Sequence, residues 1–191
     1  MNRLLFIDAE TGGLNSKIHS LLSLGLVVWD LQDGILYQRE ICQKLDRYIT
    51  TEEALNINHF NILNYKQEDI LTAKEIHSEI LSILKKYFPN EKRIPLAGHN
   101  VQFDFSFLRE MYSVAGLSYE NIFAHRMVDM FSLLQFLIHL NLIPAVVNNS
   151  TKAFEFFNIT VNGRHTALGD AVATAELYGK LLSFTKNKIT S

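Results

Sequence analysis

Cysteine is almost absent from this chain: Cys42 is the only one in 191 residues. A lone cysteine excludes an intrachain disulfide, and nothing indicates secretion. The sequence also lacks Pro/Gly-rich linkers, repeats and low-complexity segments, so a domain boundary has no place to lie. We therefore expect one domain over residues 1–184, followed by a polar tail over 185–191 that frays.

An excess of positive charge is missing as well. The chain has 18 Lys and Arg against 20 Asp and Glu, which gives a formal net charge of −2. Proteins that coat a nucleic-acid duplex are usually strongly basic, so this balance argues against that class. An enzyme that grips only a strand end needs fewer phosphate contacts, and bound divalent cations would add local positive charge. A nuclease therefore stays compatible with the composition.

Long hydrophobic runs are absent too, although apolar residues make up 48% of the chain. The run over 4–7 is too short for a signal-peptide core and ends in acids. The most apolar stretch, 130–147, is interrupted by polar residues and a proline, whereas a membrane helix needs about 20 mainly apolar residues. We expect a soluble protein with a cytoplasmic location.

Hydrophobic periodicity and turn signals predict an alternating α/β domain. Five strands are expected at 3–7, 21–29, 35–42, 94–98 and 126–128, the second and third forming an antiparallel hairpin. Helices are expected at 50–58, 73–88, 103–116, 129–140, 150–157 and 166–184. An opening hairpin followed by alternation indicates a mixed sheet.

Two acids, Asp8 and Glu10, follow the first buried strand. A period of two places both side chains on one face, with Ala9 pointing the other way. Close carboxylates raise the cost of ionising each other, and a divalent cation would stabilise both in the charged form. Taken alone, the pair also fits an ordinary acidic surface turn.

Two further segments carry candidate residues at the ends of elements. Asp104 lies on the first turn of a helix that follows a buried strand. His165 precedes the terminal helix and Asp170 lies in its first turns, where small residues would allow close packing on the sheet. Each acid also fits compensation of a helix dipole, and the histidine also fits a cap or core position. A neutral histidine is a natural proton acceptor near pH 7.

The conjunction carries more weight than any one segment. Four carboxylates and one histidine fall at three separate element ends that an α/β sheet would bring to one edge. Oxygen-rich ligand sets select Mg²⁺ or Mn²⁺ over zinc. The sequence therefore predicts a site for these ions.

Three motifs resemble those of the DEDDh family of 3′→5′ exonucleases, which includes ribonuclease T and polymerase proofreading subunits. They are DAETGGL at 8–14, GHNVQFD at 98–104 and HTALGDA at 165–171, in family order and spread over nearly the whole chain. The resemblance implies a ribonuclease-H-like fold: a five-stranded mixed sheet, its second strand antiparallel, flanked by helices.

The same resemblance implies a two-metal mechanism. Four acids would hold two Mg²⁺ or Mn²⁺ ions: Asp8, Glu10, Asp104 and Asp170. His165 would act as the general base toward the attacking water, and the product would be a nucleoside 5′-monophosphate. The substrate-binding set that it implies is Thr11, Gly12, Leu14, Asn58, Asn100 and Phe103. In proofreading members a histidine often occupies the position of Asn58, and here His59 comes one step later.

Other residues have structural interpretations. We interpret Asp129 as the cap of the helix it precedes, His99 as a hydrogen-bonding partner of the backbone, and Trp29 as a core residue. Arg164 could touch a phosphate, and a solvated side chain explains it as well.

Single-stranded 3′ ends are the expected substrate, with DNA favoured and RNA as the alternative, and a polymerase or a second copy of the chain is a candidate partner. One rival function is a phosphatase of the haloacid dehalogenase class, which usually has a second Asp where this chain has Thr174. The other is a non-catalytic module that binds strands or a polymerase.

Overall fold

Six strands form one mixed sheet in the computed structural model of the protein, which describes residues 2–190. The strand order is β4-β3-β2-β1-β5-β6, and β2 runs antiparallel to both of its neighbours while the other pairs are parallel. The strands are β1 (Arg3–Thr11), β2 (Leu21–Asp30), β3 (Gly34–Gln43), β4 (Ile70–Leu71), β5 (Leu96–Gly98) and β6 (Val128–Asp129). The mixed sheet with an antiparallel second strand confirms the expected arrangement.

The expected count of five strands is wrong by one. The additional strand, β4, pairs with β3 through Cys42–Ile70 and Gln43–Leu71. It follows the 3₁₀ turns η1 (Ile62–Asn64) and η2 (Gln67–Asp69). Two residues are too few for an alternating pattern, so only the tertiary pairing reveals this strand.

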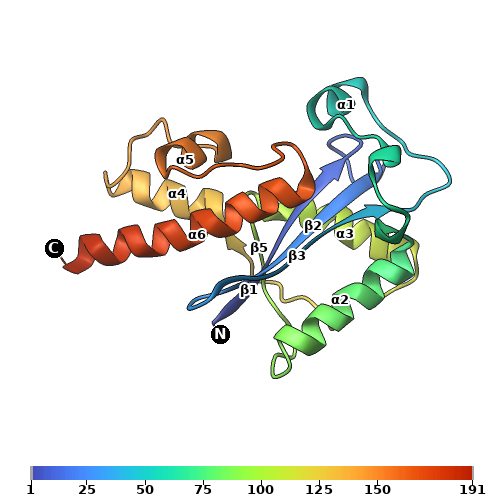
Figure 1. Cartoon of the computed structure of the whole chain (residues 1–191), viewed down its shortest axis with the longest axis horizontal. Helices are drawn as coiled ribbons and strands as arrows, with labels where there is room; N and C mark the ends of the chain where they lie inside the picture. The colour runs from blue at the N-terminus through green and yellow to red at the C-terminus, as the bar shows by residue number, and fades with distance from the viewer. Residues whose placement is uncertain (1, 191) are drawn as a thin grey trace.

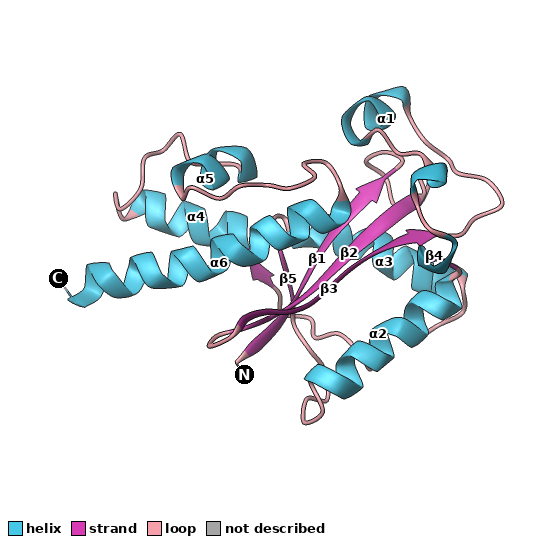
Figure 2. Cartoon of the chain, viewed as in Figure 1, coloured by secondary structure: helices cyan, strands magenta, loops and turns pink. Residues whose placement is uncertain are grey.

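Helices cover both faces of the sheet (Figures 1 and 2). One core contains α2 and α3, and the other contains α4, α5 and α6. The helices are α1 (Glu52–Asn58), α2 (Ala73–Tyr87), α3 (Val101–Val114), α4 (Met130–His139), α5 (Ser150–Phe156) and α6 (Ala167–Thr190). Thr51 caps α1 through a hydrogen bond from the Ala54 N–H at 3.2 Å.

The alternation of β1 decides which of its side chains meet which layer. Leu5, Ile7 and Ala9 belong to the core with α2 and α3, whereas Leu4 and Phe6 belong to the core with α6. Because side chains alternate along a strand, Asp8 and Glu10 continue the row of Leu4 and Phe6 on the α6 side. The same alternation that buries the apolar side chains of β1 thus also directs Asp8 and Glu10 toward α6.

The terminal helix α6 packs on β1 and β2 through small residues. Its alanines at 167, 171, 173 and 175 are all buried. The helix continues to Thr190, so it includes most of the segment over 185–191 that the sequence predicts as a polar tail. Lys186 and Lys188 are good helix formers and extend the last turns without needing a buried face.

No helix among residues 2–190 combines the length and apolar character that crossing a membrane requires. The apolar stretch over 130–147 forms α4 and the turns that follow it. Its buried residues belong to the core with α6. The interpretation of this stretch as core helix and loop is confirmed.

Candidate metal centre and substrate pocket

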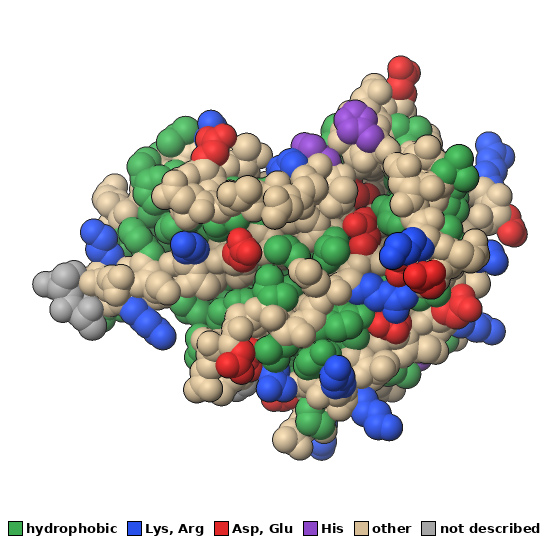
Figure 3. All heavy atoms as spheres, in the orientation of Figure 1, with side chains coloured by type: hydrophobic (Ala, Val, Ile, Leu, Met, Phe, Trp, Pro, Cys, Tyr) green, Lys and Arg blue, Asp and Glu red, His purple; other side chains and the backbone are tan. Residues whose placement is uncertain are grey.

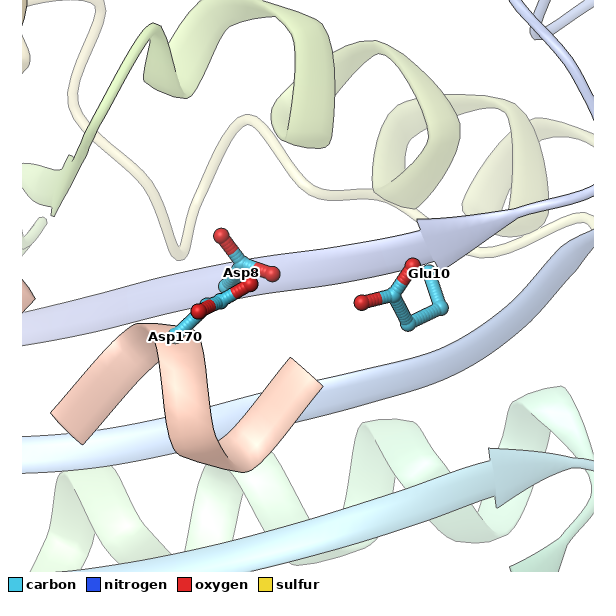
Figure 4. A group of neighbouring side chains, drawn as sticks. All are labelled: Asp8, Glu10 and Asp170. Atoms are coloured by element: carbon cyan, nitrogen blue, oxygen red, sulfur yellow. The ribbon is translucent and has the colours of Figure 1, made fainter. Parts of the chain in front are cut away.

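Three carboxylates from two elements converge beside the sheet. Asp8 and Glu10 come from β1, and Asp170 comes from the first turns of α6 (Figure 4). One oxygen from each of the three lies within 4.8 Å of the others. The space-filling view shows acidic side chains set below the surrounding atoms on this face, with histidines nearby (Figure 3).

A glycine on β2 lets α6 come this close. Gly25 pairs with Asp8 across the β1–β2 ladder. A Cβ atom added to Gly25 would lie 2.1 Å from the carbonyl oxygen of Ala167, the first residue of α6. The helix start therefore rests on bare backbone, which brings Asp170 to the two acids of β1.

Asp104 reaches the site from the opposite side of the sheet. Its carboxylate is buried and accepts a hydrogen bond from the Ala9 N–H at 2.9 Å. Strand β5 pairs with β1 only at Leu5 and Phe6, which leaves the later N–H groups of that edge without a strand partner. Asp104 fills this gap. It lies outside the trio of acids within 4.8 Å, but its negative charge raises the pKa of Asp8.

The acids repel one another in the absence of a cation. Burial raises the pKa of Asp8 well above its ordinary value, and the charges of Asp104, Asp170 and Glu10 raise it further. Burial, with the charges of Asp170 and Glu40, raises the pKa of Glu10 to about 7. A nearby divalent cation would reverse these shifts by stabilising the ionised forms.

The donor set fits such a cation. The Oδ1 atom of Asp170 is buried and has no hydrogen-bond partner within the described chain. An orphaned carboxylate oxygen in a buried position is costly unless an ion or water completes it. Carboxylate oxygens are the ligands that Mg²⁺ and Mn²⁺ prefer. The residues present therefore suit a hard divalent ion.

His165 lies just before α6, in a left-handed backbone conformation with φ of 62°. Its N–H donates to Oδ2 of Asp170 at 3.3 Å, and its exposed side chain lines a cavity of about 480 Å³. Glu10 and Asn58 line the same cavity. The structure thus places His165 beside the acids, on the solvent side.

Glu10 also lines an apolar pocket of about 470 Å³. Its lining includes Thr11, Leu14, Asn58 and Phe103 from the expected substrate set. The side chain of Leu14 is 88% exposed, so it presents apolar surface that a ligand in this pocket could contact. Asn58 lines both cavities and donates from its amide to the Thr11 carbonyl at 3.1 Å. His59 lines the polar cavity with Glu10.

Two expected substrate contacts have other surroundings. Gly12 approaches its own chain: a Cβ there would lie 2.1 Å from the Ile49 carbonyl oxygen, and its carbonyl accepts from the Thr51 N–H at 2.6 Å. This close backbone contact holds Gly12 against the segment that leads into α1. Asn100 is an exposed N-cap of α3 with φ of 58°, so its role toward a strand stays a prediction.

The prediction that His99 forms a hydrogen bond with the backbone is wrong for one of its ring nitrogens. Its Nδ1 atom is buried without a hydrogen-bond partner in the range 2–190, and the ring packs edge-on against Phe131. Burial lowers the pKa of His99 and favours its neutral form. The interpretation of Trp29 as core is confirmed.

The side chain of Arg164 is half-buried and lines the polar cavity with Glu10 and His165. Its Nη1 atom forms an ion pair with Oδ2 of Asp170 at 2.5 Å. Spacing alone gave no signal for this pair, because the arginine comes from an irregular loop. Glu40 is a second residue that the sequence did not reveal, since it lies on β3 and acts through its charge on Glu10.

Asp129 caps α4, as expected, and it also holds α3. One carboxylate oxygen accepts from the Ser132 N–H at 3.1 Å and the other from the Val101 N–H at 3.0 Å. Asp129→Asn keeps one acceptor oxygen, so we expect a loss of about 1 kcal/mol in unfolding free energy, with most activity retained. Chemical denaturation and an activity assay measure both quantities.

A matched control for this prediction is Asn149→Ala, which removes the single cap bond of α5 to the Lys152 N–H. It should cost a similar free energy and leave activity intact. Near-total loss of activity in Asp129→Asn, at unchanged stability, would show that Asp129 takes part in the chemistry.

Comparison with protein families finds a match to the exonuclease family model called RNase_T over residues 5–178. An oligoribonuclease of Buchnera aphidicola is 27% identical over 132 residues, 66% of this chain and 69% of the relative. A ribonuclease T of Haemophilus ducreyi is 24% identical, covering 96% of this chain and 86% of the relative. A PolC-type DNA polymerase III of Latilactobacillus sakei is 27% identical over 93% of this chain, but the match spans only 11% of that protein.

Solved structures with the same fold include the nuclease domain of 3′hExo, a DEDDh family member bound to rAMP, with a TM-score of 0.77 at 14% identity. That match covers 95% of this chain and 92% of the other. Exonuclease I of E. coli in complex with a dT13 oligonucleotide also gives 0.77, at 15% identity, covering 100% of this chain and 43% of the other. The family match decides against the phosphatase alternative, which also leaves Asp104 and His165 without a role.

Proposed function

The chain belongs to the exonuclease family, and on that premise we propose that it is a metal-dependent hydrolase of the DEDDh kind that removes nucleotides from single-stranded 3′ ends. The observation that carries this proposal is the convergence of Asp8, Glu10 and Asp170 within 4.8 Å beside an apolar pocket. Acids that repel one another next to such a pocket suit a cation-assisted reaction on a nucleotide.

Asp8, Glu10 and Asp170 would hold Mg²⁺ or Mn²⁺, and Asp104 completes the set from the α3 side. When bound, two such ions supply positive charge to the scissile phosphate, the attacking water and the departing oxygen. The chain's own contribution is placement. The β1–β2 ladder and the start of α6 fix the three nearest carboxylates, and the Ala9 N–H fixes Asp104.

His165 would take the proton of the attacking water. Its side chain lines the polar cavity together with Glu10, from which solvent reaches the acids. As hydroxide adds to phosphorus, the bond from phosphorus to the 3′ oxygen of the preceding nucleotide breaks. The departing 3′ oxygen would take a proton from solvent, so the shortened strand keeps a 3′ hydroxyl, and the released product is a nucleoside 5′-monophosphate. The backbone N–H of His165 donates a hydrogen bond to Asp170, which links the proposed general base to the metal site.

The apolar pocket would receive the terminal nucleotide. Leu14 and Phe103 offer apolar surface for a base, and Thr11 and Asn58 offer polar groups at the pocket's edge. Stacking of a base on apolar and aromatic side chains contributes about 1–3 kcal/mol per base and tolerates any sequence. Gly12 would act indirectly by docking α1, and Asn100 would border the strand at the start of α3.

DNA is the first substrate we propose and short RNA the second. Discrimination between them needs contacts to the 2′ position. Two relatives are named for ribonuclease activity, and exonuclease I is seen with a DNA oligonucleotide. The likeness to PolC-type polymerases also supports a polymerase, alongside a second copy of this chain, as a candidate partner.

A time course on 5′-labelled DNA and RNA oligomers tests the proposal. With Mg²⁺ or Mn²⁺ we expect labelled strands that shorten one nucleotide at a time, and chelator should stop the shortening. Single strands should react faster than blunt duplexes, because the pocket accepts one base. An intact ladder under every metal condition, or internal cleavage in place of end trimming, would refute it.

A further inference from the structure

Arg164 forms an ion pair with a proposed metal ligand, Asp170, and this ion pair has no role in the proposed chemistry. Its Nη1 atom lies 2.5 Å from Oδ2 of Asp170. The other terminal nitrogen, Nη2, donates to the hydroxyl oxygens of Ser150 at 3.3 Å and Thr151 at 3.1 Å. The guanidinium carbon lies 5.8 Å from the centre of the Phe154 ring. Arg164 is therefore held both by the acid and by the start of α5.

The positive charge of Arg164 extends beyond its direct partner. It lowers the pKa of Asp8 and of Glu10, opposing the effects of burial and of the other acids. A cation that stabilises these ionised carboxylates must also repel a second cation placed among them. The guanidinium thus partly fills the electrostatic role of a divalent ion while no ion is bound.

We propose that Arg164 is a built-in counter-cation that competes with divalent metal at Asp170 and so lowers the affinity of the site for metal. The inference rests on the metal role stated under the proposed function. When metal neutralises Asp170, the guanidinium turns away from it while keeping its bonds to Ser150 and Thr151 and its contact with Phe154. In the metal-bound protein, the contacts at the start of α5 would therefore hold the Arg164 side chain by themselves.

Titration of Mn²⁺ into the full chain without nucleic acid tests this directly, by calorimetry and by electron paramagnetic resonance. Arg164→Gln keeps a polar side chain and removes the charge, so its dissociation constant for Mn²⁺ should fall about tenfold, the order expected when one partly screened contact charge is removed. An unchanged or higher dissociation constant would overturn the proposal.

Thermal unfolding separates competition from a merely structural role. In chelator, Arg164→Gln should unfold at a lower temperature than the wild type, because the acids lose their counter-charge. Saturating Mn²⁺ should close that gap. A structural role predicts an equal deficit with and without Mn²⁺, which would count against competition.

Lys152→Gln is the matched control. Lys152 is another cation near the start of α5, but it pairs with Glu155 in solvent. Its loss should leave Mn²⁺ binding unchanged. If the wild type binds Mn²⁺ but degrades no oligomer, the proposed function fails and this inference stands. If it degrades oligomers and Arg164→Gln binds Mn²⁺ as the wild type does, only this inference fails.

Discussion

Asp8→Asn should remove nucleotide release and at the same time make the metal-free protein more stable. Asparagine has nearly the same shape but carries no charge, so the packing beside Gly25 is preserved. The loss of activity should reach about a thousandfold, because several kcal/mol of transition-state stabilisation depends on charge held by these carboxylates. Release of mononucleotides from a single-stranded oligomer measures this effect.

The gain in stability follows from the raised pKa of Asp8. A carboxyl group whose pKa is higher in the folded than in the unfolded chain stabilises the fold below its unfolded pKa, and that contribution is lost as pH rises through the folded value. At pH 8 the carboxyl group of Asp8 therefore opposes folding, since burial and three neighbouring acids disfavour its ionisation in the folded chain. Asparagine removes this penalty.

Glu10 gives the pH window for the same effect. Its pKa rises from 4.5 to about 7, so the metal-free wild type should lose stability as pH increases across this interval. For Glu10 alone the penalty is on the order of 3 kcal/mol at most. In chelator at pH 8, Asp8→Asn should unfold a few degrees higher than the wild type, and the gap should shrink at pH 5.

With Mn²⁺ bound, the wild type should unfold at a higher temperature than Asp8→Asn, which reverses the order expected in chelator. The wild type should gain thermal stability from the ion, whereas Asp8→Asn should gain little, because it lacks one ligand. Glu176→Gln, which changes an exposed acid on α6, serves as the control and should move neither quantity. A metal-free Asp8→Asn that unfolds below the wild type, or that keeps a tenth of its activity, would contradict the argument.

The sequence was sufficient for the parts of the site that follow from local periodicity. Alternation along β1 predicts that Asp8 and Glu10 share a face, and the structure places both on the α6 side. Small residues in the terminal helix predict close packing, and they bring Asp170 to the other acids. These inferences need only the period of one element and the size of its side chains.

The remaining features depend on contacts that no local pattern encodes. Asp104 reaches Ala9 because β5 is short, and strand length is the least readable property of a buried apolar run. The pairing of Arg164 with Asp170 depends on the path of an irregular loop. The strand β4 exists only because β3 offers it an edge. Each depends on how separate elements pack against one another, which the sequence of no single segment specifies.

Gly25→Ala should impair the site as strongly as the loss of a ligand, although Gly25 offers no side chain to metal or substrate. The added methyl group would lie 2.1 Å from the Ala167 carbonyl oxygen and 2.4 Å from its carbonyl carbon, so the start of α6 must move. Asp170 and the backbone of His165 would move with the start of α6, because a hydrogen bond joins them there. We expect activity to fall about a hundredfold, since a shift near 1 Å costs that much.

Stability should fall by about 1–3 kcal/mol, the usual cost of overpacking a close contact. Gly179→Ala is the matched control on α6 itself, since a Cβ there meets the Trp29 ring at an ordinary 3.6 Å. Alanine is the better helix former, so this variant should be neutral or slightly stabilising. Weakened Mn²⁺ binding in a folded Gly25→Ala protein, judged by circular dichroism, would tie the helix contact to the metal site. Wild-type Mn²⁺ affinity in that variant would mean that Asp170 reaches its place independently of Gly25.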